Sequence, residues 1–259
     1  MAVPEGDTIH RAASRLRTVL ADQPLVAISV PRWSGALPEP GETIEVVRAI
    51  GKHLVIDFSG GLSLRVHLRM TGRWRVYSHG EISARAQGGA RVLVEVPDHV
   101  VACFAAPDVA ITRRDRVAVG HLGPDLCEPD VDLDAVVARI PVRIRATTTI
   151  GEALLDQRIA CGIGNVYKSE ALFAERIDPT TPVVDLAPDL RRAVFARAHR
   201  QLRENLARGG ARRTVPEGLA VYGRAGRPCR VCGTRVTRIV QGAEQPRSTY
   251  YCTNCQVRG

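Results

Sequence analysis

The order of apolar and polar residues divides the chain into a helix followed by strands, and then a mainly helical part. From Glu5 to Ala21 the apolar positions recur at helical spacing, and Pro4 stands where the first turn of a helix tolerates proline. Short β-type runs then alternate with glycine-containing turns, at 25–31, 43–50, 53–58, 62–68, 73–77, 91–96 and 100–105. Several short strands at near-regular spacing predict a β-sandwich or a barrel.

Apolar residues return to helical spacing from about Asp132 onward. The pattern predicts helices at 132–139, 150–160, 165–175 and 187–208. Pro124 and Pro129 indicate a linker ahead of these helices. We therefore expect an α+β fold, in which an N-terminal helix plus β-sandwich domain precedes a helical domain and a C-terminal hairpin. The expected boundaries are 1–123 for the first domain, 124–131 for the linker, 132–220 for the helical domain and 221–259 for the hairpin.

Four cysteines near the C-terminus form two C-x-x-C pairs. Cys229 and Cys232 make the first pair, Cys252 and Cys255 make the second, and 19 residues separate the two pairs. Each pair can place two thiolates on one side of a tetrahedral zinc ion, and this spacing is typical of a zinc ribbon. A pair of disulfides is the alternative, although no other feature of the sequence indicates secretion. We therefore expect one structural zinc ion that holds a β-hairpin together.

Bulk composition narrows the class of protein. The chain has 259 residues, of which 45% are apolar, so it is long enough for one or two domains with their own cores. It contains no apolar run of 18 residues, and its first ten residues lack the basic start and apolar centre of a signal peptide. These features predict a soluble cytoplasmic protein with no membrane partner.

The basic residues are concentrated at the C-terminal end. Residues 191–259 carry 15 arginines and 3 acidic residues, whereas residues 1–190 carry 21 basic and 24 acidic residues. Such a basic segment around a zinc hairpin indicates a polyanionic partner, most simply nucleic acid. The alternative is a solvated basic face that serves only solubility.

Two local features could bind phosphate. Gly162 and Gly164 lead into a predicted helix whose first residue is Asn165, and a glycine turn at a helix N-terminus presents free N–H groups to an anion. A purely structural turn between helices is the alternative. Only two of the 36 basic residues are lysines, Lys52 and Lys168, which hints that those positions need a compact ammonium group.

Seven segments, in this order, resemble the formamidopyrimidine-DNA glycosylase/endonuclease VIII family of base-excision repair enzymes nearly end to end. They are Pro4-Glu5-Gly6-Asp7-Thr8, Gly51-Lys52-His53-Leu54, His67-Leu68-Arg69-Met70-Thr71-Gly72, His121-Leu122-Gly123-Pro124-Asp125-Leu126, Gly162-Ile163-Gly164-Asn165-Val166-Tyr167, Val221-Tyr222-Gly223-Arg224-Ala225-Gly226 and Arg247-Ser248-Thr249-Tyr250-Tyr251-Cys252. The resemblance implies that the helical domain contains a helix-two-turn-helix motif and that the zinc hairpin is a DNA-binding finger.

The resemblance also implies a bifunctional DNA glycosylase/AP lyase that acts on double-stranded DNA with damaged bases or abasic sites. In such enzymes the damaged base is flipped out of the duplex. The amine of an N-terminal proline then attacks the sugar C1′ to form a Schiff base, and elimination cleaves the strand. Pro4 matches that nucleophile, and Glu5 matches the acid/base residue. Without the resemblance, Glu5 would be interpreted as a first-turn glutamate favoured by the helix dipole.

Four further residues match DNA contacts of the family. Lys52 matches a lysine near the phosphate of the lesion, Asn165 a phosphate-binding asparagine, and Arg247 a phosphate-clamping arginine of the zinc hairpin. Met70 lies where the family inserts a side chain into the gap left by the flipped base. The alternatives are a surface lysine at a turn for Lys52 and a core methionine in a strand for Met70.

Three departures favour the endonuclease VIII-like branch, which typically removes oxidised pyrimidines. Enzymes specialised for oxidised purines carry Pro-Glu-Leu at the start, an Arg-Phe-Gly wedge and a long loop over the lesion. This chain has Gly6 after Glu5, the run Arg113-Arg114-Asp115-Arg116 with no Phe-Gly, and only a short stretch at 209–219.

One departure concerns the nucleophile itself, because Ala2 and Val3 separate Pro4 from Met1. If translation begins at Val3 and this residue is removed, the Pro4 amine is free. If Met1 is the start, Pro4 is an amide, and the alternative is a catalytically silent protein that binds damaged DNA. A zinc-ribbon RNA-binding or transcription module is a third possibility, but it leaves residues 1–80 unexplained. We expect a monomer, since one flipped base needs one clamp.

Overall fold

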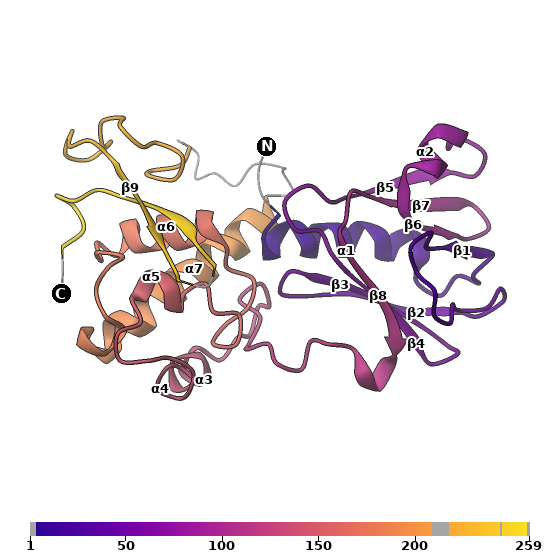
Figure 1. Ribbon diagram of the computed structural model, residues 1–259, viewed down its shortest axis with the longest axis horizontal. Coiled ribbons are helices and arrows are strands. Elements are labelled where there is room, and N and C mark those ends of the chain that lie inside the picture. The colour runs from indigo at the N-terminus through magenta and orange to yellow at the C-terminus, as the bar shows by residue number, and fades with distance from the viewer. Residues whose placement is uncertain (1–3, 209–217, 244, 258–259) are drawn as a thin grey trace. The chain divides into compact units, whose positions relative to one another are not determined.

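The structure is a computed structural model that describes residues 4–208, 218–243 and 245–257. The chain divides into two compact units, 1–120 and 121–259, which are described separately below (Figure 1). Within the described residues, no helix combines the length and the apolar character needed to cross a membrane.

The N-terminal unit begins with helix α1 (Gly6–Leu20). Its apolar residues recur every three or four positions, so Ile9, Ala13, Leu16 and Leu20 lie on one face and are all buried in the core. The helix ends at Ala21, whose backbone is extended, and the following Asp22 has a positive φ of 62°. The helix predicted from Glu5 to Ala21 is therefore confirmed to within one residue at each end.

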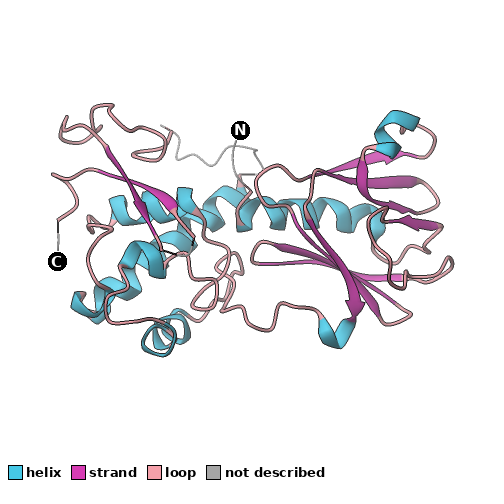
Figure 2. Ribbon diagram, in the orientation of Figure 1, coloured by secondary structure: helices cyan, strands magenta, loops and turns pink. Residues whose placement is uncertain are grey.

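Two four-stranded antiparallel sheets form the rest of this unit (Figure 2). The first sheet has the order β1-β6-β7-β5, and its strands are β1 (Ala27–Ser29), β6 (Ala90–Glu95), β7 (His99–Phe104) and β5 (Arg73–Ser78). The second has the order β2-β3-β4-β8, and its strands are β2 (Ile44–Ile50), β3 (His53–Phe58), β4 (Leu62–His67) and β8 (Asp108–Arg113). Side chains from both sheets and from α1 share one apolar core, which includes the fully buried Phe58 and Leu64.

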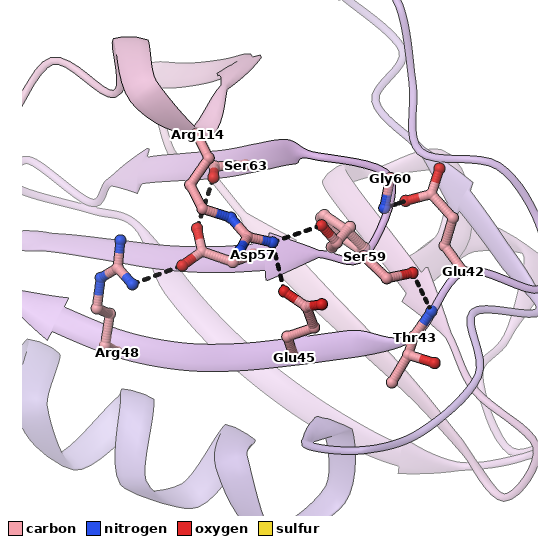
Figure 3. A network of polar contacts seen from close by, with 10 residues as sticks. Glu42, Thr43, Glu45, Arg48, Asp57, Ser59, Gly60, Ser63 and Arg114 are labelled. Atoms are coloured by element: carbon pink, nitrogen blue, oxygen red, sulfur yellow. Dashed lines mark hydrogen bonds and ion pairs between the residues drawn. The ribbon is translucent and has the colours of Figure 1, made fainter.

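A polar network secures the second sheet on its strands β2, β3 and β4 (Figure 3). The buried Asp57 accepts a hydrogen bond from Ser63 Oγ at 2.5 Å and pairs with Arg48 at 2.5 Å. Arg114, in the short 3-10 helix η1 (Arg114–Arg116), donates to Glu45 Oε2 at 2.5 Å and to the Phe58 carbonyl at 2.7 Å. The buried carboxylate is thus compensated, as a charge in this position requires.

The C-terminal unit is mainly helical and ends in a two-stranded sheet (Figure 2). Its elements are α3 (Leu133–Ala138), α4 (Ile140–Arg143), α5 (Ile150–Ala153), α6 (Asn165–Ala174), η2 (Val183–Asp185), α7 (Pro188–Ala207), β9 (Thr237–Gln241) and β10 (Arg247–Tyr251). A separate apolar core joins α3 to α7 and contains the buried residues Phe195 and Leu202 of the longest helix.

The predicted fold class is confirmed, and three local expectations differ from the structure. The helix expected at 150–160 is only α5, because the side chains of Asp156 and Gln157 form hydrogen bonds with backbone groups of the following turn instead of continuing the helix. Strand β8 and the short helix α2 (Ala84–Gly88) were not expected. The domain boundaries given by the sequence stay predictions.

Candidate nucleic-acid interface and zinc centre

Pro4 and Glu5 lie at the entrance to α1. Pro4 is half-buried, and Glu5 is the N-cap residue, with a side chain that is only 1% exposed. The Glu5 side chain caps no backbone N–H of the helix, and the acidic residue of the first turn is Asp7, which pairs with Arg11 at 2.9 Å. The dipole interpretation of a solvated first-turn glutamate therefore fits Glu5 poorly. Glu5 is enclosed by the protein and directly follows Pro4 in the chain.

Lys52 lies in the tight turn between β2 and β3, where Gly51 has a φ of +56°. The strands at this turn bring the rings of His53 and His67 together, with centroids 4.8 Å apart. Burial, followed by the nearby Arg69 guanidinium, lowers the pKa of His67 to about 4. His67 is thus neutral near pH 7, and its Nδ1 accepts a hydrogen bond from the Arg69 amide at 3.1 Å. Lys52 is a half-buried cation in this turn, and Arg65, which is also partly buried, contacts His53 Nδ1 at 3.1 Å.

Met70 lies in the turn between β4 and β5 and is 61% exposed. It belongs to no strand and to no core cluster of the described residues, so the interpretation of Met70 as a core residue is wrong. The turn is held by Arg69, which adopts a φ of +51°, and by Thr71, whose hydroxyl donates to the Ala105 carbonyl at 3.2 Å. An exposed apolar side chain on a constrained turn is what insertion into a base stack requires.

A second loop lies beside the Met70 turn and carries only small side chains. The loop between β7 and β8 is Ala105, Ala106 and Pro107, and it lies beside the Met70 turn through the Thr71 hydrogen bond. The run Arg113–Arg116 lies at the other end of β8, where Arg114 is held by Glu45 and Phe58 (Figure 3). The loop Ala105–Pro107 carries no bulky side chain, and the role of the run Arg113–Arg116 in the comparison with purine-type enzymes stays a prediction.

In the C-terminal unit, a glycine turn leads into α6. Gly162 has a φ of +102°, a conformation that a residue with a Cβ adopts only under strain. Gln157 fixes the turn, since its side-chain oxygen accepts from the Gly162 amide at 3.2 Å and its nitrogen donates to the Ile163 carbonyl at 3.2 Å. Asn165 is the first residue of α6, whose first turn contains no acidic residue. The backbone N–H groups of that turn and the half-buried Asn165 can together bind an anion.

Three consecutive residues of α6 bind the segments that lead to and form the zinc hairpin. The fully buried Lys168 donates from Nζ to the Ser248 carbonyl at 3.2 Å, and Ser169 Oγ accepts from the Tyr250 amide at 3.3 Å. Glu170 accepts hydrogen bonds from three successive amides, at 2.8 to 2.9 Å, namely those of Ala220, Val221 and Tyr222. The sequence did not identify Ser169 or Glu170, and the rarity of lysine was the only signal for Lys168.

Arg247 begins β10 and is exposed. Its guanidinium contacts only adjacent chain, the Pro246 carbonyl at 3.3 Å and Gln245 Oε1 at 3.4 Å, and it forms no ion pair with a described residue. Its cross-strand partner, Gln241, donates to Thr149 Oγ1 at 3.0 Å and to the Pro179 carbonyl at 2.9 Å. The position of Arg247 is therefore fixed through the hairpin, and its planar fork is available to a phosphate.

The four cysteines of the C-x-x-C pairs lie together, with their sulfur atoms all within 4.8 Å of one another. Cys229 Sγ and Cys255 Sγ are 3.9 Å apart, and Cys232 Sγ and Cys252 Sγ are 3.4 Å apart. A tetrahedral zinc site with Zn–S bonds of 2.3 Å has S···S edges of about 3.8 Å, so the arrangement fits one zinc ion. Hydrogen bonding from Thr234 lowers the pKa of Cys232 to about 6, whereas burial raises the pKa of Cys252 and raises that of Cys255 to about 12, so the fit to zinc depends on the geometry of the four sulfur atoms. The predicted structural zinc site is confirmed.

Comparison with known domain families covers most of the chain. Residues 3–114 match the formamidopyrimidine-DNA glycosylase N-terminal domain, and residues 122–216 match the formamidopyrimidine-DNA glycosylase H2TH domain. Residues 226–257 match a zinc finger found in FPG and IleRS.

Similar proteins match along nearly their whole length. The probable endonuclease 8 2 of Streptomyces coelicolor is 40% identical, over 98% of this chain and 94% of that protein. The DNA-(apurinic or apyrimidinic site) lyase Nei2 of Mycolicibacterium smegmatis is 36% identical, over 98% of this chain and 99% of that protein. Among solved structures, the Lactococcus lactis formamidopyrimidine-DNA glycosylase bound to DNA containing an AP site has the same fold, with a TM-score of 0.79, 21% identity and coverage of 98% and 99%.

Proposed function

This chain belongs to the formamidopyrimidine-DNA glycosylase and endonuclease 8 family, and we propose that it is a base-excision-repair DNA glycosylase with AP lyase activity. The observation that carries the assignment of chemistry is the placement of Glu5. Its carboxyl group is buried to 1% exposure immediately after Pro4, at the point where α1 begins. A carboxyl side chain enclosed beside an amine can move protons without competition from bulk water.

The proposed reaction needs the nitrogen of Pro4 as a free amine. Its lone pair forms a bond to C1′ of the sugar while the bond from C1′ to the base breaks, and the base leaves with a proton. Loss of the amine proton leaves a neutral nitrogen on C1′. Glu5 then gives a proton to O4′, the C1′–O4′ bond breaks and the nitrogen lone pair forms the C=N bond of the Schiff base. Removal of a proton from C2′ then expels the 3′ phosphate oxygen. An α-amine has an ordinary pKa of about 7.7–8.0, so part of it is unprotonated at neutral pH. Glu5 holds and returns the protons in these steps.

Four residues hold the DNA in this proposal. Lys52, Asn165 and Arg247 bind phosphates of the strand that carries the lesion, each from a backbone position fixed by a turn or by the hairpin. Met70 fills the gap that the flipped base leaves, which its 61% exposure on a constrained turn supports. The zinc ion has a structural role, since four cysteines complete its tetrahedron and leave no position for substrate.

We further propose that the lesion is an oxidised pyrimidine. The relatives named endonuclease 8 or Nei2 are 36–40% identical to this chain, whereas a formamidopyrimidine-DNA glycosylase from Aromatoleum aromaticum is 32% identical. The loop Ala105–Pro107 also lacks the bulky wedge of purine-type enzymes. We expect the protein to act as a monomer on duplex DNA in the bacterial cytoplasm.

Borohydride trapping tests the chemistry. A protein that begins at Pro4 should form a covalent adduct with a duplex carrying an abasic site, and the protein that begins at Met1 should form little or none. Glu5→Gln should still bind this duplex while its trapping rate falls by about a hundredfold or more, the scale of a lost general acid/base. Trapping rates on duplexes with thymine glycol and with 8-oxoguanine test the lesion class.

The alternative is a catalytically silent protein that binds damaged DNA. It applies if Pro4 is preceded by residues in the mature protein, and intact-mass analysis from the native host measures this directly. Equal binding of both N-terminal forms to abasic duplex, with no adduct from either at any pH, would overturn the enzymatic proposal and leave the binding function.

A further inference from the structure

The outer face of the sheet β1-β6-β7-β5 carries a cavity of about 740 Å³. Strand β5 alternates, so that Trp74 and Val76 pack into the core while Arg73, Arg75 and Tyr77 line the cavity. Helix α2 lies over this face and forms another wall (Figure 1). The basic residues that line the cavity are Arg32, Arg73, Arg75, Arg85 and Arg91.

No acidic residue lines this cavity. The lining arginines form no ion pair with any residue in the described ranges, although arginines of the other sheet are each paired with a carboxylate, as Arg48 is with Asp57. The five positive charges that line this cavity repel one another, and a cavity lined by positive charge concentrates anions. The arrangement is therefore unfavourable for the isolated protein and is relieved by an anionic ligand.

Two of the arginines are held in place by the protein. Arg91 donates from Nε to the Ala106 carbonyl at 3.0 Å, and its Nη1 is buried with no hydrogen-bond partner among the described residues. Arg73 lies over the Phe104 ring, 5.3 Å from its centroid. These contacts with the protein determine where the guanidinium groups of Arg91 and Arg73 lie.

Two others are available to a ligand. The guanidinium groups of Arg75 and Arg85 form no hydrogen bond or ion pair with any described residue, and they come from opposite walls, β5 and α2. Arg73 and Arg75 are two positions apart on one strand, which places their backbones about 6.8 Å apart. This separation is comparable to the repeat of phosphates along an extended nucleic-acid strand.

We propose that this cavity binds the phosphates of single-stranded DNA, at a site separate from Lys52, Asn165 and Arg247. Arginines supply bidentate contacts to phosphate, and the partly exposed Tyr77 offers an aromatic surface to a base. Stacking on an aromatic side chain needs an unpaired base, which favours a single strand over a duplex. Thr71 lines one edge, so the bound strand runs toward the Met70 turn. The proposal relies on the proposed function only for the nature of the ligand.

Binding of a labelled eight-residue oligothymidylate, measured by fluorescence anisotropy, tests the proposal. The measurement is made on the full chain with unlabelled abasic-site duplex at saturating concentration, so that the duplex site is already occupied. We expect the oligonucleotide to bind under these conditions. The double variant Arg75→Gln/Arg85→Gln should bind it about tenfold more weakly, with a salt slope reduced by about 1.4, or 0.7 for each lost phosphate contact.

The matched control is Arg15→Gln/Arg116→Gln, which removes the same charge from exposed positions outside the cavity and should leave oligonucleotide binding within twofold. Thermal unfolding of both variants checks that neither loses its fold. Inorganic tripolyphosphate in place of the oligonucleotide distinguishes a strand from a free anion. The proposal is overturned if the duplex displaces the oligonucleotide completely, if both double variants lose binding equally, or if only tripolyphosphate depends on Arg75 and Arg85.

Unchanged borohydride trapping by the cavity variant separates this inference from the proposed enzymatic function. Loss of trapping in the Glu5→Gln variant alone would leave the cavity proposal standing. Loss of oligonucleotide binding in the cavity variant alone would support the cavity and leave the reaction at Pro4 untouched.

Discussion

In the N-terminal unit the residues proposed to act on DNA lie at the ends of elements whose apolar faces fill one core, whereas in the C-terminal unit they depend on polar tethers and a metal. Glu5 precedes α1, and Lys52 lies between two strands of the sandwich. Arg247, in contrast, lies on a two-stranded hairpin whose own apolar cluster is small, with Val221 and Val236 among its buried members. A hairpin of this size is marginal alone, so it needs additional constraints.

This difference in support predicts which perturbations should displace the proposed DNA-binding residues of each unit. The first unit should lose its site only when its core unfolds, because the site positions are fixed by the backbone of well-packed strands. The second should lose Arg247 while most of its helices remain folded, because single hydrogen bonds and one ion determine where the hairpin lies. Four changes test this contrast, beginning with the largest expected effect.

Removal of zinc should have the largest effect and should be confined to the C-terminal unit. Structural zinc contributes about 10 kcal/mol or more to the folding of a small finger. Chelation, or Cys252→Ser at a fully buried ligand, should lower the affinity for abasic duplex by at least about a hundredfold as Arg247 loses its support. Affinity and zinc content are measured together. Cys103→Ala, at an equally buried cysteine of the other unit, should leave both unchanged; undiminished binding by the zinc-free protein would break the contrast.

Glu170→Gln should destabilise the C-terminal unit by about 2–3 kcal/mol, because one of three backbone amides would then face an NH₂ group instead of an oxygen. Urea unfolding measures the change, and trapping measures its effect on activity. Glu204→Gln on the exposed surface of α7 removes the same charge and should change stability by less than about 0.5 kcal/mol. Equal effects of the two variants would show that the tether contributes nothing.

Gly162→Ala should cost about 2 kcal/mol, because a residue with a Cβ is strained at a φ of +102°. The change also displaces the turn before Asn165, so duplex affinity should fall with it. Gly120→Ala, where an added Cβ meets open space and no positive φ occurs, is the comparison. If Gly162→Ala lost stability but bound duplex normally, the turn would be structural only.

The smallest effect concerns pH and the N-terminal unit. Because the pKa of His67 is lowered to about 4, its neutral form stabilises the fold fully above pH 6.5, and this contribution is lost as pH falls from 6.5 to 4. The ring is partly exposed, so we expect only about 1–2 kcal/mol over this window. Urea unfolding at pH 7 and pH 4.5 should show a smaller pH effect in His67→Gln. An equal pH effect in the variant would assign it to other groups.

Period-2 and period-3.6 patterns located α1 and most strands, because those elements bury one face against a core. Strand β8 escaped detection because it lies at a sheet edge, follows Pro107 and has only Ile111 fully buried. Helix α2 buries no residue completely, so its pattern carries no apolar face. The expected helix at 150–160 was too long because apolar residues continue through 159–163. In the structure these residues belong to the turn that the Gln157 side chain holds.

The residues of the candidate site also differ in how far the sequence alone could identify them. The spacing of the cysteines alone indicated the metal site, because the two cysteines of a C-x-x-C pair are close in sequence and therefore lie close together in space. Pro4, Glu5, Met70 and Arg247 came from resemblance to a family, whereas the glycine turn and the rarity of lysine had also indicated Asn165 and Lys52. The roles of all six residues stay predictions. Glu170 and Gln241 could not be found, because their partners lie 51 and 92 residues away in sequence and only the fold brings them together.

Three adjacent residues of α6 hold the zinc hairpin and the segment before it, so the position of the hairpin depends on the rotation of these residues about the helix axis. Lys168, Ser169 and Glu170 project from the helix at successive steps of about 100°, so each reaches a different stretch of backbone. Inserting a single alanine between Asn165 and Lys168 would rotate all three side chains about the helix axis by that angle, away from their hydrogen-bond partners. A helix with an inserted or deleted residue could still bury its apolar face by repacking. It could not keep the directions in which the three side chains point. A change of length in α6 would therefore need a compensating change in the zinc hairpin.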